Sequence, residues 1–270
     1  MAKTRMLRWL RWIFAFYVFV GLLFYLFQDQ LLFHPERVHP TDDYEIAYPH
    51  RPLSIPINEI DTLHLIEFLP DSATARKGVV LYFHGNRKHI GYYADQTPAM
   101  TKAGYRVLMI DYPGYGKSSG KLTEAKLYEW SEIVYRIAHK QHSADSILIY
   151  GKSLGTGVAT RLASIRACKG LILETPYYDL PTVAARFLPI YPTRWMINYS
   201  FPLHTYLSEV KAPVFIFHGT EDEVIGIKQA KRLEQKLKTS DRLLIVEGGK
   251  HNGLNENKSV RAALDSIWNK

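Results

Sequence analysis

A serine with one glycine two residues before it and another two residues after it is the first feature of this sequence that could do chemistry. Residues 151–155 read Gly-Lys-Ser-Leu-Gly, with Ser153 at the centre. The apolar run at 147–150 before them is typical of a buried strand, and a helical pattern at 158–167 follows. A serine on such a sharp turn needs small neighbours, because backbone presses on backbone, and the amides after it can stabilise an oxyanion. The motif predicts a nucleophile at Ser153, with an ordinary glycine-rich loop as the alternative.

A nucleophilic serine requires a base and an acid, which should lie on loops after later strands in the order Ser, Asp or Glu, His. Asp222 follows an expected strand at 214–217. His251 follows the last expected strand, at 243–246, and is the only one of the eleven histidines beyond it. We therefore predict a catalytic triad of Ser153, Asp222 and His251.

Other carboxylates could take the place of the predicted acid. Glu221 and Glu223 are its direct neighbours, and Glu174 ends an earlier expected strand. Asp222 is preferred because it lies four residues beyond His218, at the end of its strand. Glu174 is the first alternative.

An oxyanion intermediate also needs backbone donors, one of them from the loop after an earlier strand. The sequence His-Gly-Asn at 84–86 follows an expected strand at 78–83. The backbone N–H groups of Asn86 and Leu154 are therefore the predicted oxyanion hole. His84 and His218, which each precede a glycine at a strand end, are expected to be scaffold residues.

The elements that must position these residues alternate between buried strands and helices from residue 78 onward, which predicts an α/β fold with a mostly parallel central sheet and helices on both faces. Two half-buried antiparallel strands are expected before it, at 53–58 and 62–69. The later strands are expected at 78–83, 105–110, 147–150, 170–173, 214–217 and 243–246, and the helices at about 91–102, 124–140, 158–167, 228–238 and 255–268.

One connection, 175–212, has 38 residues, where a crossover needs only about a dozen. It contains five prolines, which break a helix into short pieces, and it is rich in aromatic residues. It is either an ordinary crossover or a lid insertion at about 176–210 over an apolar substrate pocket. The aromatic residues predicted to line that pocket are Tyr177, Tyr178, Phe187 and Trp195.

The N-terminal segment predicts a membrane anchor at 1–30, with about 9–28 spanning the bilayer. Residues 12–28 carry no charge and would form about 25 Å of helix, slightly shorter than a bilayer core. A cleaved signal peptide or an interfacial helix is the alternative, but no small-residue cleavage site follows the apolar run. The four basic residues among the first eleven predict a cytoplasmic N-terminus, which would place the domain at 31–270 on the outer face of the membrane.

Composition excludes several other classes. The net charge is +8, but half of it lies in the first eleven residues, and no basic block with interleaved aromatics predicts a nucleic-acid partner. The two Gly-Lys-Ser triplets, at 116–118 and 151–153, lack the earlier glycine of a phosphate-binding loop. A single cysteine, Cys168, forms no internal disulfide. The sequence predicts no metal site, no cofactor and no particular oligomeric state.

Together these motifs make the chain from residue 78 onward resemble the α/β-hydrolase superfamily. They are His84-Gly-Asn86, Asp111-Tyr-Pro-Gly-Tyr-Gly116, Gly151-Lys-Ser153-Leu-Gly155, His218-Gly-Thr-Glu-Asp222 and Gly248-Gly-Lys-His251. With its anchor, the chain is similar to the membrane-anchored α/β-hydrolase-domain branch, which includes animal protein depalmitoylases and fungal polarity-associated members. It departs from that branch in the basic residues 87–89 and in having no N-terminal cysteine cluster for palmitoylation.

The resemblance implies a serine hydrolase that acts on esters or thioesters. We expect small acyl or lipid-like substrates, because an aromatic-rich lid beside a bilayer suits apolar chains. A serine aminopeptidase shares the scaffold, and Glu174 or Asp179 could then hold a substrate amine. A non-catalytic binding or scaffold protein is the alternative from another class.

Overall fold

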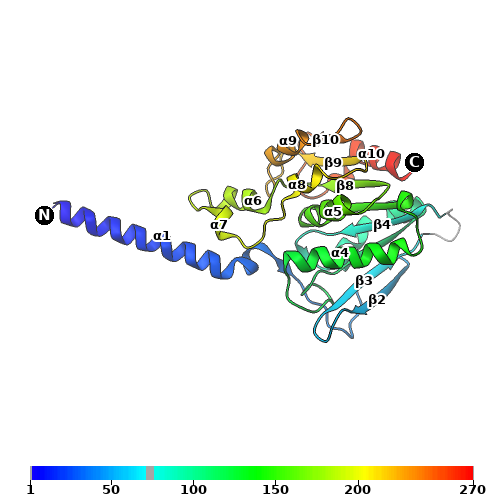
Figure 1. The fold of residues 1–270 in the computed structure, drawn as a ribbon, viewed down its shortest axis with the longest axis horizontal. Coiled ribbons are helices and arrows are strands. Elements are labelled where there is room, and N and C mark those ends of the chain that lie inside the picture. The colour runs from blue at the N-terminus through cyan, green and yellow to red at the C-terminus, as the bar shows by residue number, and fades with distance from the viewer. Residues whose placement is uncertain (1, 71–75, 270) are drawn as a thin grey trace.

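A computed structural model describes residues 2–70 and 76–269 of the chain. Within this part, an eight-stranded sheet has the order β10-β9-β8-β7-β4-β6-β3-β2 (Figure 1). The strands are β2 His50–Pro56, β3 Thr62–Phe68, β4 Gly78–Phe83, β6 Tyr105–Ile110, β7 Ile147–Lys152, β8 Gly170–Glu174, β9 Val214–Gly219 and β10 Arg242–Val246. Across the sheet from β10 to β6, which includes β4, each strand is parallel to its neighbour. Strand β3 pairs antiparallel with both β2 and β6. The predicted fold class is confirmed.

The sheet is buried on both faces. Along β4, Val79, Leu81 and Phe83 pack into one hydrophobic core, and Val80 and Tyr82 pack into the other. This alternation follows from the period of two in a strand. Helices cover both faces, so the sheet has the three-layer arrangement that its continuous apolar strands require.

The helices pack their apolar residues into these two cores, and some of them differ from the expected bounds. The first core contains apolar residues of α4, Glu124–His139, and α5, Leu154–Ile165, and the second contains those of α3, Pro98–Lys102, and α10, Lys258–Trp268. The helix expected at 91–102 is broken into α2, Ile90–Tyr93, a 3₁₀ turn at 94–96 and α3, because proline occupies the first position of α3. Helix α9, Lys228–Glu234, ends four residues earlier than expected.

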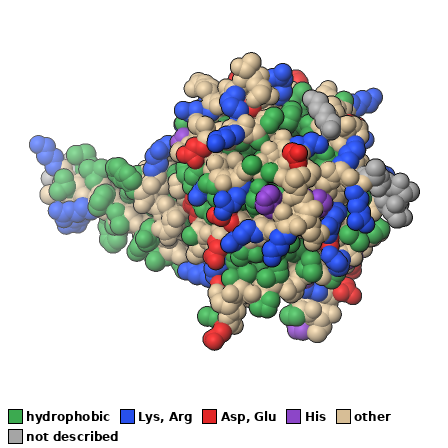
Figure 2. All heavy atoms as spheres, turned by 45° about the vertical axis from the view of Figure 1, so that its right-hand side comes forward, with side chains coloured by type: hydrophobic (Ala, Val, Ile, Leu, Met, Phe, Trp, Pro, Cys, Tyr) green, Lys and Arg blue, Asp and Glu red, His purple; other side chains and the backbone are tan. Residues whose placement is uncertain are grey.

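The N-terminal helix α1, Ala2–Leu32, projects from the domain (Figure 1). Most of its apolar side chains are exposed, and Figure 2 shows them along the projecting arm, with basic side chains toward its free end. In the described part of the chain, α1 is the one helix long and apolar enough to cross a membrane. It is longer than the span predicted at 9–28, and its backbone departs from helical geometry at Phe27.

The long connection 175–212 contacts α1 with one part, and its last part packs in the core of the domain. It forms three short helices, α6 Leu180–Phe187, α7 Thr193–Met196 and α8 Leu203–Leu207, of which α6 and α7 lie beside the C-terminal part of α1 (Figure 1). Beyond α1, the short strand β1, His34–Pro35, pairs in parallel with β5, Arg87–Lys88. The end of α1 therefore reaches the loop that follows β4.

Candidate active site

Ser153 lies on a tight turn between β7 and α5. Its backbone has φ 50° and ψ −117°, a conformation that residues other than glycine rarely adopt. The neighbouring glycines are needed for this turn, because a Cβ on Gly155 would overlap the backbone of Phe83, and one on Gly151 would lie 2.5 Å from the carbonyl oxygen of Gly155. The backbone N–H of Ser153 donates to the carbonyl oxygen of Glu174 at 2.9 Å, which ties the turn to β8.

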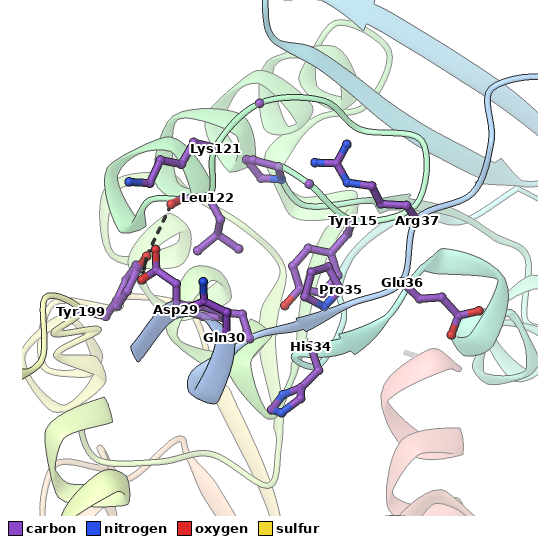
Figure 3. Close-up of a pocket in the computed structure, with 14 residues that line it drawn as sticks. Asp29, Gln30, His34, Pro35, Glu36, Arg37, Tyr115, Lys121, Leu122 and Tyr199 are labelled. Carbon is purple, nitrogen blue, oxygen red and sulfur yellow. Dashed lines mark hydrogen bonds between the residues drawn. The ribbon is translucent and has the colours of Figure 1, made fainter. Parts of the chain in front are cut away.

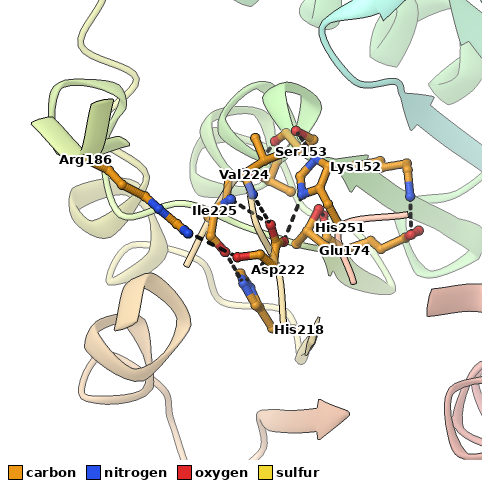
Figure 4. Close-up of polar contacts among 11 residues, drawn as sticks. Lys152, Ser153, Glu174, Arg186, His218, Asp222, Val224, Ile225 and His251 are labelled. Atoms are coloured by element: carbon orange, nitrogen blue, oxygen red, sulfur yellow. Dashed lines mark hydrogen bonds and ion pairs between the residues drawn. The ribbon is translucent and has the colours of Figure 1, made fainter. Parts of the chain in front are cut away.

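The structure brings Ser153, Asp222 and His251 together at the carboxyl edge of the parallel strands (Figure 4). The His251 Nε2 lies 3.1 Å from the Ser153 Oγ, and the His251 Nδ1 lies 2.8 Å from the Asp222 Oδ2. All three side chains are buried. These three residues are separated along the chain, and they meet because parallel strands end at the same edge of a sheet.

The hydrogen bonds fix the orientation of the His251 ring. A carboxylate oxygen accepts, so the Nδ1–H of His251 donates a hydrogen bond to Asp222. The Nε2 is then left to accept a hydrogen bond from the Ser153 hydroxyl. The other oxygen of Asp222 accepts the backbone N–H groups of Val224 and Ile225 at 2.9 and 2.7 Å, which holds the carboxylate in position.

His218 is a scaffold residue beside the acid. Its Nε2 donates to the carbonyl oxygen of Ile225 at 2.7 Å and lies 3.5 Å from the Asp222 Oδ2. Burial lowers the pKa of His218, so its ring is neutral. His84 is also buried, between the rings of Tyr93 and Tyr112, and burial lowers its pKa to about 4. Both therefore have the structural surroundings expected of them.

Glu174 is committed to a different partner. Its carboxylate forms a buried ion pair with Lys152 and accepts a hydrogen bond from the hydroxyl of Tyr150 at 2.6 Å. The His251 ring bonds to Asp222 instead. The role of Lys152 was missed by sequence reasoning, although it is the residue directly before the predicted nucleophile.

The predicted oxyanion loop lies next to the serine. Asn86 and Ser153 line the same cavity, and a Cβ on Gly85 would lie 3.6 Å from the Ser153 Cβ. Two hydrogen bonds join this loop to the end of α1 and the residues after it. The Asn86 side chain donates to the carbonyl oxygen of Leu32 at 2.7 Å. The Asn86 carbonyl accepts from the backbone N–H of His34 at 3.0 Å. Leu154, the other predicted donor, begins α5.

A cavity of about 580 Å³ opens above Ser153 and His251. One wall is apolar and combines the end of α1 with α6. Its residues are Leu31, Leu32, Leu180, Val183, Ala184 and Phe187. The contribution of α1 was not predicted, and no local pattern in the sequence could reveal it.

Of the four aromatic residues predicted to line the pocket, only Phe187 does so. Tyr177 is buried instead, and its hydroxyl donates to the carbonyl oxygen of Leu154 at 3.1 Å. Tyr178 stacks on His204, and Trp195 is 87% exposed on the outer surface. These three differ from the prediction because Tyr177 and Tyr178 lie in the loop before α6, and Trp195 lies in α7, whereas the cavity wall is formed by α6 and the end of α1.

A second cavity, of about 630 Å³, lies at the base of α1 (Figure 3). Its lining includes Asp29, Arg37, Lys121 and Tyr199, but no member of the predicted triad. Within residues 2–70 and 76–269, no group of three or more His, Cys, Asp or Glu side chains could hold a metal ion.

Comparisons with known proteins agree with this fold. The chain matches the family described as serine aminopeptidase, S33, over residues 74–205. An esterase from Pyrococcus furiosus has a similar structure, with a TM-score of 0.65 at 17% identity, covering 87% of this chain and 94% of the esterase. The chain therefore has the α/β-hydrolase fold.

Its relatives by sequence are α/β-hydrolase domain-containing proteins. It is 32% identical to α/β-hydrolase domain-containing protein 17C of Xenopus tropicalis over 178 residues, and 30% identical to that of Mus musculus over 185 residues. These alignments cover 65% and 67% of this chain, and 56% and 57% of the relatives. The chain thus spans little more than half the length of these relatives. The resemblance to this branch is confirmed.

Proposed function

We propose that the chain is a serine hydrolase that cleaves carboxylic esters or thioesters of apolar acyl groups. The observation that carries this proposal is the continuous set of hydrogen bonds from Asp222 through His251 to Ser153. The strained backbone of Ser153 supports it, since such strain persists where the surrounding structure enforces it and is common at reactive residues.

The reaction would follow from this geometry. The Ser153 Oγ attacks the acyl carbonyl while the His251 Nε2 takes its proton. The backbone N–H groups of Asn86 and Leu154 hold the resulting oxyanion. His251 then returns the proton to the leaving alcohol or thiol, and an acyl-enzyme remains. A water molecule, deprotonated by His251, hydrolyses the acyl-enzyme and restores Ser153.

The cavity supports an apolar acyl group as the substrate. Its wall from α1 and α6 presents apolar side chains directly beside Ser153. In this proposal α6 belongs to a lid at about 176–210, with Phe187 as the pocket residue. Apolar lining with a few polar groups is the usual composition of a small-molecule site.

We propose further that α1 anchors the domain in a membrane. Lys3, Arg5, Arg8 and Arg11 favour a cytoplasmic N-terminus, which places the domain on the outer face. A reporter that works only outside the cytoplasm, fused after residue 30, should be active. Activity of a cytoplasmic reporter alone would contradict this topology.

A serine aminopeptidase is the main alternative, because the matching family carries that description. It would need a free carboxylate for the substrate ammonium. Glu174 is already paired with Lys152. Asp179 caps α6 by accepting from the Thr182 backbone and also pairs with Arg194. Both carboxylates are therefore occupied, so neither is free to hold a substrate ammonium.

A fluorophosphonate probe tests the proposal directly. We expect it to label the full chain and to lose that labelling in the Ser153→Ala variant. Nitrophenyl esters of increasing chain length should be hydrolysed, and peptide amides much more slowly. Failure of both labelling and ester hydrolysis would instead support a non-catalytic protein.

A further inference from the structure

From the end of α6 into α7 the chain exposes three large apolar side chains, beside one charged side chain, Arg194, which pairs with Asp179. Phe187, Ile190 and Trp195 are 61%, 70% and 87% exposed. We call residues 187–195 the lid tip. A concentration of large apolar side chains on a surface usually marks a contact with another phase or molecule.

The lid tip is joined to α1 near the middle of that helix. The rings of Tyr17 and Tyr191 stack with centroids 4.6 Å apart and an interplanar angle of 4°. The Tyr17 hydroxyl donates to the carbonyl oxygen of Ile190 at 3.0 Å, and the Tyr191 hydroxyl donates to that of Tyr17 at 3.1 Å. Gly21 permits this approach, since a Cβ there would lie 2.9 Å from the Tyr191 ring.

A second set of contacts fixes the same connection lower on α1. Gln28 accepts from the backbone N–H of Asn198 at 2.7 Å and donates to the carbonyl oxygen of Met196 at 3.2 Å. The hydroxyl of Tyr199 donates to Asp29 at 2.8 Å. Contacts at two levels prevent the lid tip from sliding along α1 or turning away from it.

These contacts determine the depth of the lid tip. Tyr17 lies within the uncharged run 12–28, eleven residues or about 16 Å of helix before Gln28. A bilayer core is about 30 Å thick. If α1 crosses a bilayer, a segment bound at Tyr17 therefore lies among the lipid chains and not in water. The hydroxyls of Tyr17 and Tyr191 each donate to a backbone carbonyl, so neither is left unpaired at such a position.

We propose that the lid tip is seated in the bilayer beside α1, so that the domain contacts the membrane through two elements. The occupant of this apolar surface is the lipid itself, because the surface continues the exposed apolar face of α1. This inference rests on the anchoring role of α1 in the proposed function. It adds a route for the substrate: Phe187 belongs to both the lid tip and the cavity wall, so an acyl chain in the bilayer meets the cavity without crossing water.

Spin labels measure this depth. In a Cys168→Ser background, the full chain with Ile190→Cys or Trp195→Cys is labelled and placed in phosphatidylcholine–phosphatidylglycerol vesicles. Val18→Cys, on α1, reports the anchor, and Thr239→Cys, exposed before β10 at the opposite edge of the sheet, reports water. We expect labels at 18, 190 and 195 to be more accessible to oxygen than to a water-soluble nickel complex, and the label at 239 to show the reverse.

The outcomes separate the inference from the function. Labels that are in lipid at 18 but in water at 190 and 195 would overturn the inference alone. A label in water at 18 would overturn the anchor together with the inference. Labels at 190 and 195 protected from both reagents would indicate a second copy as the occupant, and would also refute a lipid seat.

An activity comparison provides the second readout. The variants Ile190→Asp and Trp195→Asp should lower hydrolysis of a long-chain ester embedded in vesicles by at least about ten-fold, and leave hydrolysis of a short water-soluble ester unchanged. If the variants hydrolysed the long-chain ester as fast as the unmodified chain does, the inference would be contradicted. No hydrolysis of either ester by the unmodified chain would contradict the proposed function, whereas the label depths would still decide the position of the lid tip.

Discussion

Lys152 and Glu174 form a buried ion pair directly before the serine turn. Their side chains are 7% and 1% exposed, so water screens neither charge. The pair joins the ends of β7 and β8, and the Glu174 backbone also accepts the N–H of Ser153. The charges thus support the turn without entering the set of hydrogen bonds among Ser153, His251 and Asp222.

Removing one charge of this pair should cost more than removing both. Glu174→Gln leaves the Lys152 ammonium buried without its partner, and we expect a loss of about 3 kcal/mol in unfolding free energy. The double variant Lys152→Met/Glu174→Gln should recover most of that loss. Urea unfolding in detergent micelles measures both. Additive losses would contradict a buried ion pair.

Asp222 and Glu174 should differ sharply in their effect on catalysis. Asp222→Asn removes the acceptor that orients His251, so kcat should fall on the order of 10⁴-fold. The double variant at Lys152 and Glu174 should keep kcat within about ten-fold of the unmodified chain. Steady-state rates on a short nitrophenyl ester, with fluorophosphonate labelling to count active sites, make the comparison. The reverse order would identify Glu174 as the acid.

Asn86 should affect the rate through its attachment to α1. Asn86→Ala keeps the proposed backbone donor but loses the hydrogen bond to Leu32, worth about 1 kcal/mol. We expect kcat to fall about five-fold with KM nearly unchanged. The control is Asn58→Ala, which loses its side-chain hydrogen bonds to Asp61 and Ile60 in the turn before β3, away from Ser153. Equal rates for the two variants would argue against a role for this attachment.

Gly155, in the serine turn, should tolerate a methyl group much less well than Gly248 does. Gly155→Ala would press a Cβ into the Phe83 backbone, and should cost at least about 4 kcal/mol in unfolding free energy. Gly248 has φ 67° but open space around it, so Gly248→Ala should cost only about 1 kcal/mol. Thermal or urea unfolding of both variants tests the contrast.

His84 should make the fold sensitive to acid. Burial lowers its pKa from 6.5 to about 4, so between these values the unfolded chain binds more protons than the folded one. The folded state is therefore destabilised as the pH falls from 6.5 to 4, by roughly 3 kcal/mol in total. His84→Phe should reduce this pH dependence, whatever its effect at pH 7. Unfolding free energies that vary with pH equally in both chains would refute this.

The features that sequence reasoning predicted well are those with a local cause. A strand that ends in a tight glycine turn places Ser153, and strand ends on one edge of a sheet place Asp222 and His251 beside it. Contacts between distant segments have no such local signal. The contact of Tyr177 with Leu154 and the contact of Leu32 with Asn86 each join segments that are far apart in the sequence.

The parallel pairing of β1 with β5 has a consequence for any protease that cuts near residue 33. Such a cut would break the covalent link between α1 and β1, so that α1 would be held only by non-covalent contacts, such as those with the connection 175–212. It would also leave the segment with His34 without its fixed end. In the proposed function, the segment that joins the domain to its anchor thus also supports the proposed oxyanion loop. A form cut at this point is expected to hydrolyse esters more slowly than the full chain.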